Sequence, residues 1–263
     1  MDEKFCRISK KNDLITVCDF GQHALCGYFP STSNEKLEFG RLSLAWSPSS
    51  GLLQLEDDLC IDNMYGENYG YRSGLNSSMV SHLQRKVKYL ISVVGEENLE
   101  CVLDIGSNDG TLLSFYSNNV KKIGMDPTIK KFKKYYSSDI KAIPEFFDAN
   151  TFLKNNNNQK ADIITSIAMF YDLKDPNCFV ANIAESLSKD GIWNFEQSYM
   201  PSMLSKNAYD TVCQEHIEYY SLKVVKDLLE ANNLKIIDVA FNNINGGSFS
   251  VIAGHKNSKH IPN

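Results

Sequence analysis

The stretch CVLDIGSNDGTLL at 101–113 decides the fold of this chain. Its first five residues form a largely apolar run of strand length, and Gly106, Asn108 and Gly110 follow directly. Because an open α/β sheet binds ligands beyond the carboxyl ends of its strands, we expect these three residues to form a cofactor-binding turn. A dinucleotide fingerprint needs glycine where this chain has Asn108, since the backbone there approaches a pyrophosphate. The turn therefore suits S-adenosyl-L-methionine, a nucleoside without a pyrophosphate.

Strands and helices alternate around this turn. The predicted strands are 101–105, 120–125, 140–143, 161–169 and 191–196, and the predicted helices are 77–95, a lysine-rich segment from 128, 179–187 and 222–231. This alternation indicates a parallel sheet with crossover helices. The last two strands, 234–241 and 248–255, are joined by a turn-prone NNINGG segment and should form an antiparallel hairpin. A doubly wound, Rossmann-like α/β sheet that ends in such a hairpin is the outline of the class I methyltransferase fold.

Asp126 ends the strand after the glycine turn, about 20 residues further on, where a carboxylate can accept both ribose hydroxyls. Pro127 fixes the turn that follows. Gly106 alone is equally consistent with a plain strand-to-helix turn, and Asp126 alone with a helix cap, but the two at this spacing favour cofactor binding. Asp104 is expected to orient the loop or to lie near the cationic methionine end of the cofactor.

Two aromatic residues follow the third strand. Phe146 and Phe147 are placed to cover an adenine face, and we assign Phe147 to the cofactor site. An aromatic pair is more often part of a hydrophobic core, so the alternative role is packing.

Composition limits the possible functions. The 263 residues include 27 Lys and Arg against 32 Asp and Glu, and this net charge of -5 argues against a protein that binds duplex nucleic acid through bulk positive charge. The 7 cysteines are an odd number and include no Cys-x-x-Cys pair, which indicates free thiols. We see no signal peptide and no apolar stretch of membrane-spanning length, so we expect a cytoplasmic protein without a membrane partner.

The first 75 residues have a different pattern. Short strand-like runs at 14–20, 42–46 and 52–55 alternate with turn residues and show no helical periodicity. We therefore predict a small β-rich region at 1–75 and a domain that binds S-adenosyl-L-methionine at 76–263.

Four sequence motifs indicate a particular family: LDIGSNDGTLL (103–113), FEQSYMPSML (195–204), YDTVCQEHIEYYSL (209–222) and NGGSFSV (245–251). Together they resemble the sugar C-methyltransferases of nucleotide-sugar pathways, a class I family that uses S-adenosyl-L-methionine. Weaker similarities at 5–9, 52–55 and 69–74 extend the resemblance over nearly the whole chain.

The resemblance implies an acceptor site and its residues. His216 is expected to be the general base, because imidazole titrates near neutrality, and Glu215 to orient it or contact the acceptor. Tyr199 should line the cavity mouth, together with Glu196 and Gln197, and Tyr71 with Tyr69 should close over the cofactor. Without the resemblance, the favoured interpretation is that His216 caps the next helix and Glu215 is a charge facing solvent. The implied acceptor is a sugar, a nucleotide-sugar or a similar small polar metabolite, including a phosphorylated one, used in surface-polysaccharide or capsule biosynthesis.

The chain departs from the family in three places. Four cysteines usually form a zinc site near the amino terminus, but the equivalent positions here are Cys6, Ser9, Ser47 and Ser50, so we predict no metal. A further carboxyl-terminal domain usually helps to hold the nucleotide-sugar, and the chain stops after the hairpin, so we expect an acceptor that is small or of a different class. The family's His-Glu-His word reads Gln214-Glu215-His216, preceded by Cys213 in place of tyrosine. Because carbon chemistry needs a well-equipped acid/base pair, O-methylation is favoured.

Three alternatives remain open. One is a C-methyltransferase acting on a nucleotide-linked deoxysugar. A second is a non-catalytic subunit that binds S-adenosyl-L-methionine, suggested by the lost cysteines and by Gln214. A third is a dinucleotide oxidoreductase, which Asn108 and the terminal hairpin disfavour.

Overall fold

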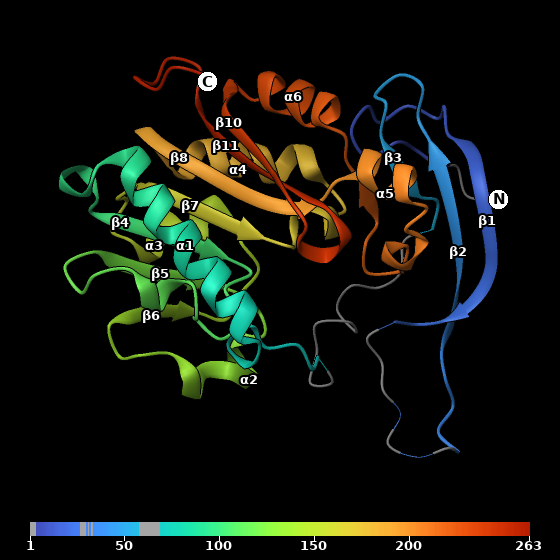
Figure 1. The fold of residues 1–263 in the computed structure, drawn as a ribbon, viewed down its shortest axis with the longest axis horizontal. Coiled ribbons are helices and arrows are strands. Elements are labelled where there is room, and N and C mark those ends of the chain that lie inside the picture. Colours follow the sequence, from blue (N-terminus) through green and yellow to red (C-terminus); the bar gives the residue numbers. More distant parts are fainter. Residues whose placement is uncertain (1–3, 27–29, 31, 33, 58–68) are drawn as a thin grey trace.

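In the computed structural model, which describes residues 4–26, 30, 32, 34–57 and 69–263, the larger of two sheets forms the centre of the chain (Figure 1). It has seven strands in the order β10-β11-β8-β7-β4-β5-β6. Their bounds are β4 Cys101–Ile105, β5 Lys121–Met125, β6 Ile140–Ile143, β7 Ala161–Ile167, β8 Leu187–Ser198, β10 Leu234–Asn242 and β11 Ser248–His255. The strands from β8 to β6 pair in parallel, and β11 pairs antiparallel with both β8 and β10. The predicted α/β sheet with a terminal antiparallel hairpin is confirmed.

The strand order reverses beside β4. The chain moves outward from β4 to β5 and β6, and then returns to place β7 on the other side of β4. The two crossovers leave in opposite directions, so a crevice opens beyond the carboxyl ends of β4 and β7. The predicted cofactor turn begins at that point, directly after Ile105.

Helices cover both faces of the sheet (Figure 1). One face packs on α1, Ser77–Val94, whose buried stripe is Leu83, Val87, Leu90 and Val94. The helix begins where the Asn76 side chain accepts hydrogen bonds from two backbone amides, and it ends at Gly95, whose φ of 89° suits glycine. The other face packs on α3 Ala149–Asn155, α4 Pro176–Ser186 and α6 Leu222–Ala231.

Three helical segments differ from the sequence prediction. Helix α3 and α5, Met200–Lys206, were not predicted, and the lysine-rich helix α2 covers only Ile129–Phe132. In α2 only Ile129 and Phe132 are buried, so packing supports a single turn. The start of α3 is fixed instead by the Asp148 side chain, which accepts hydrogen bonds from the amides of Asn150 and Thr151.

The amino-terminal region forms a second, antiparallel sheet. Its strands are β1 Ile15–Ala24, β2 Phe39–Trp46, β3 Leu53–Leu55 and β9 Glu218–Tyr219, in the order β1-β2-β3-β9. The fourth strand comes from the far end of the chain, and Arg7 joins the two parts by donating hydrogen bonds to the carbonyls of Leu55 and Ile217. The boundary at residue 75 stays a prediction, since this sheet is completed by residues from beyond it.

Cys6, Ser9, Ser47 and Ser50 form a hydrogen-bonded group. Cys6 Sγ lies 3.1 Å from Ser50 Oγ and accepts a bond from the Ser9 amide at 3.4 Å. Burial opposes ionisation of the Cys6 thiol, but hydrogen bonds from Ser47, Ser50 and Ser9 outweigh it and lower the pKa of Cys6. One thiol among three serines is a poor donor set for Zn²⁺, so these residues do not fit a zinc ion.

Among the residues that the structure describes, no helix has the length and apolar character needed to cross a bilayer.

The buried carboxyl group of Glu218 in β9 should make the free energy of unfolding depend on pH. Burial raises the pKa of Glu218 from 4.5 to about 8, and its carboxylate accepts a hydrogen bond from Tyr220 Oη at 2.6 Å. Between these two values the folded state holds a proton that the unfolded state has released, so the free energy of unfolding should fall as pH rises from 4.5 to about 8. We expect Glu218→Gln to flatten this decline and to raise Tm at pH 8 more than at pH 5, measured by calorimetry. An identical pH dependence in both proteins would contradict the assignment.

Candidate cofactor and acceptor site

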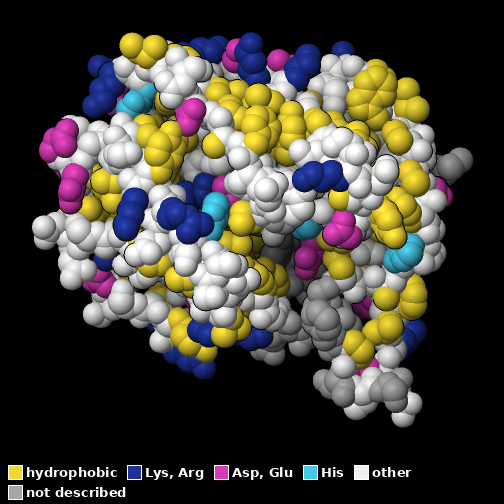
Figure 2. Space-filling view, viewed as in Figure 1, with side chains coloured by type: hydrophobic (Ala, Val, Ile, Leu, Met, Phe, Trp, Pro, Cys, Tyr) yellow, Lys and Arg dark blue, Asp and Glu magenta, His cyan; other side chains and the backbone are white. Residues whose placement is uncertain are grey.

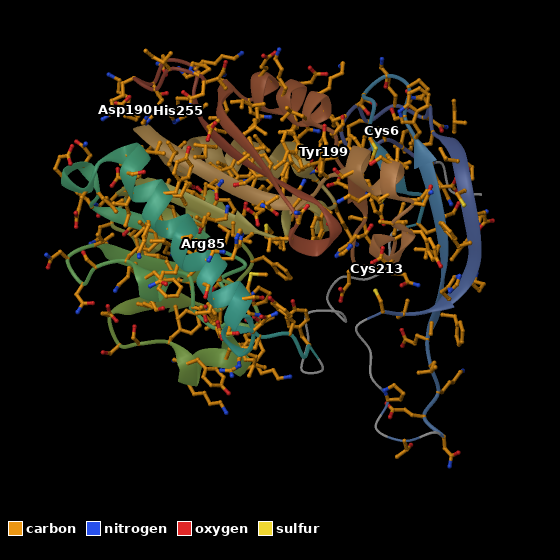
Figure 3. All side chains as sticks on the ribbon, viewed as in Figure 1. Cys6, Arg85, Asp190, Tyr199, Cys213 and His255 are labelled. Atoms are coloured by element: carbon orange, nitrogen blue, oxygen red, sulfur yellow. The ribbon has the colours of Figure 1, made fainter. Side chains whose placement is uncertain are left out.

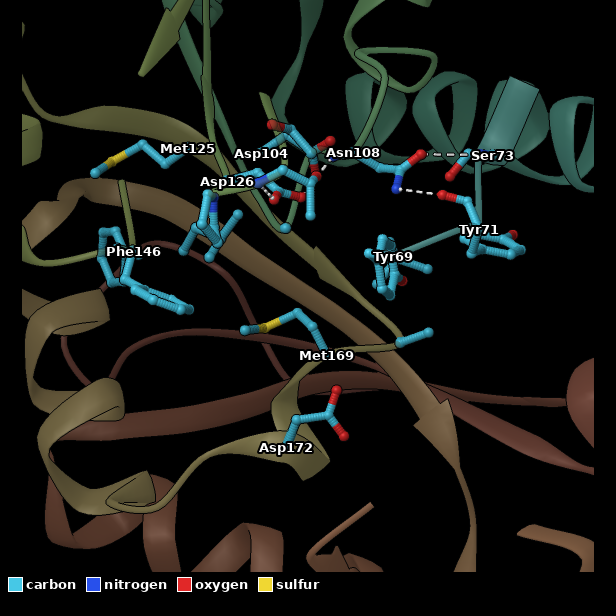
Figure 4. A pocket seen from close by; sticks show the side chains of 18 of the residues that line it. Tyr69, Tyr71, Ser73, Asp104, Asn108, Met125, Asp126, Phe146, Met169 and Asp172 are labelled. Carbon is cyan, nitrogen blue, oxygen red and sulfur yellow. Dashed lines mark hydrogen bonds between the residues drawn. The ribbon is translucent and has the colours of Figure 1, made fainter. Parts of the chain in front are cut away.

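A cavity of about 910 Å³ opens at the crevice beside β4 and β7 (Figure 4). The space-filling view shows a hollow in the surface, bordered by acidic and hydrophobic side chains (Figure 2). Nine of the eleven predicted site residues line the cavity, namely Tyr71, Asp104, Gly106, Asn108, Asp126, Pro127, Phe147, Glu215 and His216. The remaining two, Gly110 and Tyr199, do not.

The turn after β4 has a left-handed backbone at three positions. Gly106, Asn108 and Gly110 have φ values of 68°, 51° and 77°. A Cβ at Gly106 would lie 3.2 Å from Met169 Cγ, so glycine is needed there for space as well as for conformation. Asparagine tolerates the left-handed region better than most side chains, which explains how Asn108 replaces the glycine of other nucleotide-binding turns.

Asn108 also fixes the segment that faces the turn. Its Oδ1 accepts a hydrogen bond from the Ser73 amide at 3.0 Å, and its Nδ2 donates to the Tyr71 carbonyl at 3.1 Å (Figure 4). These two bonds hold 71–73 over the cavity. This bridge could not be predicted from the sequence, because residues 71 and 108 are brought together only by the fold.

Asp126 binds backbone amides on both sides. Its Oδ2 accepts a hydrogen bond from the Asn108 amide at 2.8 Å and its Oδ1 from the Thr128 amide at 2.6 Å. Burial raises the pKa of Asp126, and these hydrogen bonds oppose the rise. A carboxylate has about four acceptor positions, so each oxygen keeps capacity for a further donor. Asp126 therefore orders the turn and also presents acceptors to the cavity.

Asp104 lies in β4, as predicted, and lines the cavity. Thr165 Oγ1, on β7, donates a hydrogen bond to Asp104 Oδ1 at 2.5 Å. Burial raises the pKa of Asp104 to about 7. The residue therefore bonds one strand to its neighbour and presents a carboxyl group that is partly protonated near neutrality.

Aromatic rings form two walls of the cavity. Phe146 has 55% of its surface exposed, whereas Phe147 packs edge-on against Phe179 with ring centroids 5.4 Å apart. Phe146 therefore presents the freer ring, and Phe147 also serves the core. Tyr69 and Tyr71 line the opposite side, where burial raises the pKa of both phenols.

His216 and Glu215 reach the same cavity from the segment before β9. His216 Nδ1 lies 2.9 Å from the Thr211 carbonyl, and the imidazole meets the Tyr171 ring edge-on at 4.3 Å between centroids. With Nδ1 anchored as the donor, Nε2 is the nitrogen left to accept a proton. Burial raises the pKa of Glu215.

The cavity wall includes residues that sequence reasoning missed. Met169, Tyr171 and Asp172 follow the carboxyl end of β7, the strand beside β4. These residues could have been predicted to line the cavity because they follow a strand that lies beside the glycine turn. That prediction requires the order of the strands in the sheet, which the sequence pattern does not specify.

Tyr199 does not contribute to the cavity. Its ring packs against Phe241 and Phe249, each at 5.0 Å between centroids, near the β10–β11 hairpin (Figure 3). Pairing of β8 with β11 continues to Ser198, which carries Tyr199 onto the hairpin side. Tyr199 follows the expected strand, but the structure places its ring on the hairpin and outside the cavity lining.

Three other predicted residues, Glu196, Gln197 and Gly110, also lie outside the cavity lining. Glu196 faces α1, where its carboxylate lies 2.6 Å from His82 Nε2 and 2.7 Å from Lys86 Nζ, and neither Glu196 nor its neighbour Gln197 lines the cavity. Gly110 has a φ of 77°, and an added Cβ would lie 3.1 Å from the Tyr136 ring.

Two family models match parts of this chain. A family model described as "Methyltransferase domain" matches residues 79–239, and one described as "Putative zinc binding domain" matches residues 6–65. The C-methyltransferase NovU of Streptomyces niveus is 23% identical over 259 residues, which cover 97% of this chain and 61% of NovU. The chain thus spans about three fifths of the length of that curated relative.

Two solved structures illustrate the shared fold. Magnesium protoporphyrin IX methyltransferase (ChlM) from Synechocystis PCC 6803, solved with bound SAH, has a TM-score of 0.50 and 14% identity over 73% of this chain and 90% of its own. Mitomycin 7-O-methyltransferase MmcR has a TM-score of 0.51 and 13% identity over 69% of this chain and 55% of its own. Since the methyltransferase model matches well over half of the residues, the chain belongs to the methyltransferase domain family.

Proposed function

We propose that this protein is a methyltransferase that takes its methyl group from S-adenosyl-L-methionine and transfers it to a sugar, a nucleotide-sugar or a similar small polar metabolite. The observation that supports this most is that a single cavity holds both the glycine turn with Asp126 and the His216–Glu215 pair. A nucleoside donor and its acceptor need to meet in one enclosed space.

The chain offers suitable groups for each part of the donor. The Asp126 carboxylate would accept the ribose hydroxyls, and the Gly106–Asn108 turn allows close approach of the backbone. The exposed Phe146 ring, with Phe147 beside it, would cover the adenine. The sulfonium of the bound donor supplies an activated methyl group and a neutral leaving group. Relatives of the same fold are described with bound SAH, the demethylated product.

The acceptor end has groups for moving a proton. The anchored imidazole of His216 would take the proton from an acceptor hydroxyl through Nε2, while Tyr171 and the Thr211 carbonyl hold the ring in place. Glu215 lines the cavity beside it and would bind acceptor hydroxyls. We favour O-methylation, since a hydroxyl acceptor needs only this single base. A place in surface-polysaccharide biosynthesis rests on the resemblance alone.

C-methylation is the second candidate, and it is favoured by the similarity to NovU, a C-methyltransferase. Methylation at carbon requires removal of a proton next to a carbonyl before the methyl arrives. In D₂O with SAH and a nucleotide-linked keto-sugar, an enzyme of this kind should exchange that proton for deuterium, raising the acceptor mass by one unit. An O-methyltransferase should leave the mass unchanged, which is the result we expect.

Calorimetry tests the donor assignment. We expect SAH to bind with one site per chain and NAD to give no saturable heat, because the turn at Asn108 lacks the glycine of a pyrophosphate site. Saturable binding of NAD instead would favour an oxidoreductase. Binding of SAH without methyl transfer to any nucleotide-sugar would favour the non-catalytic subunit.

The Phe146 ring should contribute measurably to donor affinity. Phe146→Ala removes a ring that is 55% exposed, and its loss should weaken SAH binding by about 0.5–1.5 kcal/mol, or roughly 2- to 13-fold. The matched control is Phe39→Ala, which removes a ring 60% exposed on β2, outside the cavity. Equal affinities in all three proteins would remove Phe146 from the adenine site.

A further inference from the structure

Two cysteines and a glutamate converge beside the acceptor end of the cavity. Cys26 follows β1, while Cys213 and Glu215 precede β9. Cys213 is labelled in Figure 3. The two sulfur atoms and a carboxylate oxygen all lie within 4.8 Å of one another, and all three residues are half-buried. They are the only three such groups that the described part of the chain brings this close together.

The buried side-chain amide of Gln214 holds the segment that carries Cys26 beside the segment that carries Cys213 and Glu215. Gln214 is 3% exposed, and its Oε1 accepts a hydrogen bond from the Cys26 amide at 3.3 Å. Its Nε2 donates to the Ala24 carbonyl, also at 3.3 Å. Gln214, which lies between Cys213 and Glu215 in the sequence, therefore positions Cys26 opposite these two residues.

The donor set has the chemistry of a zinc site. Two thiolates and one carboxylate provide soft and hard ligands of the kinds that Zn²⁺ takes, with Zn–S near 2.3 Å and Zn–O near 2.1 Å. Tetrahedral coordination at these lengths places the ligand atoms roughly 3.5 to 3.8 Å apart, so a small contraction of the observed group suffices. Three protein ligands leave a fourth position open, the arrangement typical of catalytic zinc.

We propose that Cys26, Cys213 and Glu215 bind a thiophilic divalent cation of the zinc class, with its open position toward the cavity. This site is separate from the group around Cys6, whose serines do not fit zinc. Glu215 lines the cavity together with His216, so an acceptor oxygen at the open position would be polarised beside the imidazole. That catalytic use rests on the proposed function, whereas metal binding does not.

Cobalt reports on the ligands directly, because Co²⁺ bound to thiolate shows charge-transfer absorption in the near ultraviolet. Titration of the reduced protein with Co²⁺ should give this absorption with one equivalent, and Zn²⁺ should abolish it. Cys26→Ser and Cys213→Ser should each remove the band. Glu215→Gln and Gln214→Ala should weaken Co²⁺ binding at least tenfold, the latter because a residue that orients ligands typically contributes 10- to 100-fold. Cys178→Ser, which removes an exposed thiol in α4, and Cys6→Ser are the matched controls and should leave the band intact.

The outcomes separate this proposal from the donor assignment. No band after full reduction, a band that survives both cysteine variants, or a Cys26–Cys213 disulfide that excludes metal in the native protein would overturn the metal site. Calorimetry with SAH on the same samples shows whether each variant is folded. Normal SAH binding without Co²⁺ binding would remove the metal site and leave the proposed function intact. Co²⁺ binding without SAH binding would do the reverse.

Discussion

Asp126→Ala should weaken SAH binding by about 1–3 kcal/mol, which is roughly 5- to 150-fold. The carboxylate is 7% exposed, and its two oxygens already bind the amides of Asn108 and Thr128. It is therefore held in one orientation before the donor arrives, so little entropy is lost when ribose hydroxyls bind to it. Isothermal titration calorimetry of the variant and the parent protein measures the difference.

A control variant at a second aspartate distinguishes the loss of ribose binding from the loss of backbone hydrogen bonds. Asp148 also accepts hydrogen bonds from backbone amides, those of Asn150 and Thr151, but it lies outside the cavity. Asp148→Ala should lower stability by about 1 kcal/mol, the usual cost of losing a helix cap, with unchanged SAH affinity. If both alanine variants bind SAH as tightly as the parent, Asp126 does not hold the ribose.

His216→Ala should reduce methyl transfer by about a hundredfold or more, with SAH affinity preserved. General-base catalysis contributes on this scale, and no other imidazole lines the cavity among the described residues. Nδ1 is bonded to the Thr211 carbonyl and the ring packs on Tyr171, so the variant loses a group that is already oriented. The measurement is SAH production with a panel of nucleotide-linked sugars under saturating donor.

The matched control for this prediction is His255→Ala. His255 Nε2 lies 3.3 Å from the Leu187 carbonyl, so this side chain also contacts a backbone carbonyl, but it is outside the cavity. Its loss should leave turnover unchanged. Near-native turnover of His216→Ala would assign the proton transfer to another group.

The order of strands and helices in the central sheet was largely predictable because its patterns are local. The strand 101–105, the helix 222–231 and the terminal hairpin each begin and end within a residue or so of the prediction. Buried strands of four to seven apolar residues and a helix with an apolar stripe carry their own signals. Helix α3 was missed because its start depends on the Asp148 cap rather than on a repeating apolar pattern.

Site residues that directly follow a parallel strand could be predicted from their position along the chain. Residues whose place depends on how strands pair in the sheet could not. Gly106 and Asp126 follow strands directly, so their place at the crevice follows from topology. Tyr199 also follows a strand, but the antiparallel partner β11 carries it away from the cavity. Pairing across the sheet decides this, and it was not readable from the sequence around Tyr199.

Contacts between distant segments were beyond sequence reasoning altogether. The bonds from Asn108 to 71–73, and from Gln214 to the segment after β1, connect residues that are far apart in the chain. In the sequence, Gln214 is only a departure from a family motif. In the structure it positions Cys26 beside Cys213, which assigns it a role that its identity alone does not suggest.

The central claim is that the cavity beside β4 binds the methyl donor. A structure from crystals grown with millimolar SAH tests it most directly. We predict SAH in the cavity beside β4, with both ribose hydroxyls on the Asp126 carboxylate, the adenine against Phe146 and the thioether sulfur directed toward His216. A cavity without SAH under these conditions, or SAH bound elsewhere on the chain, would contradict the account.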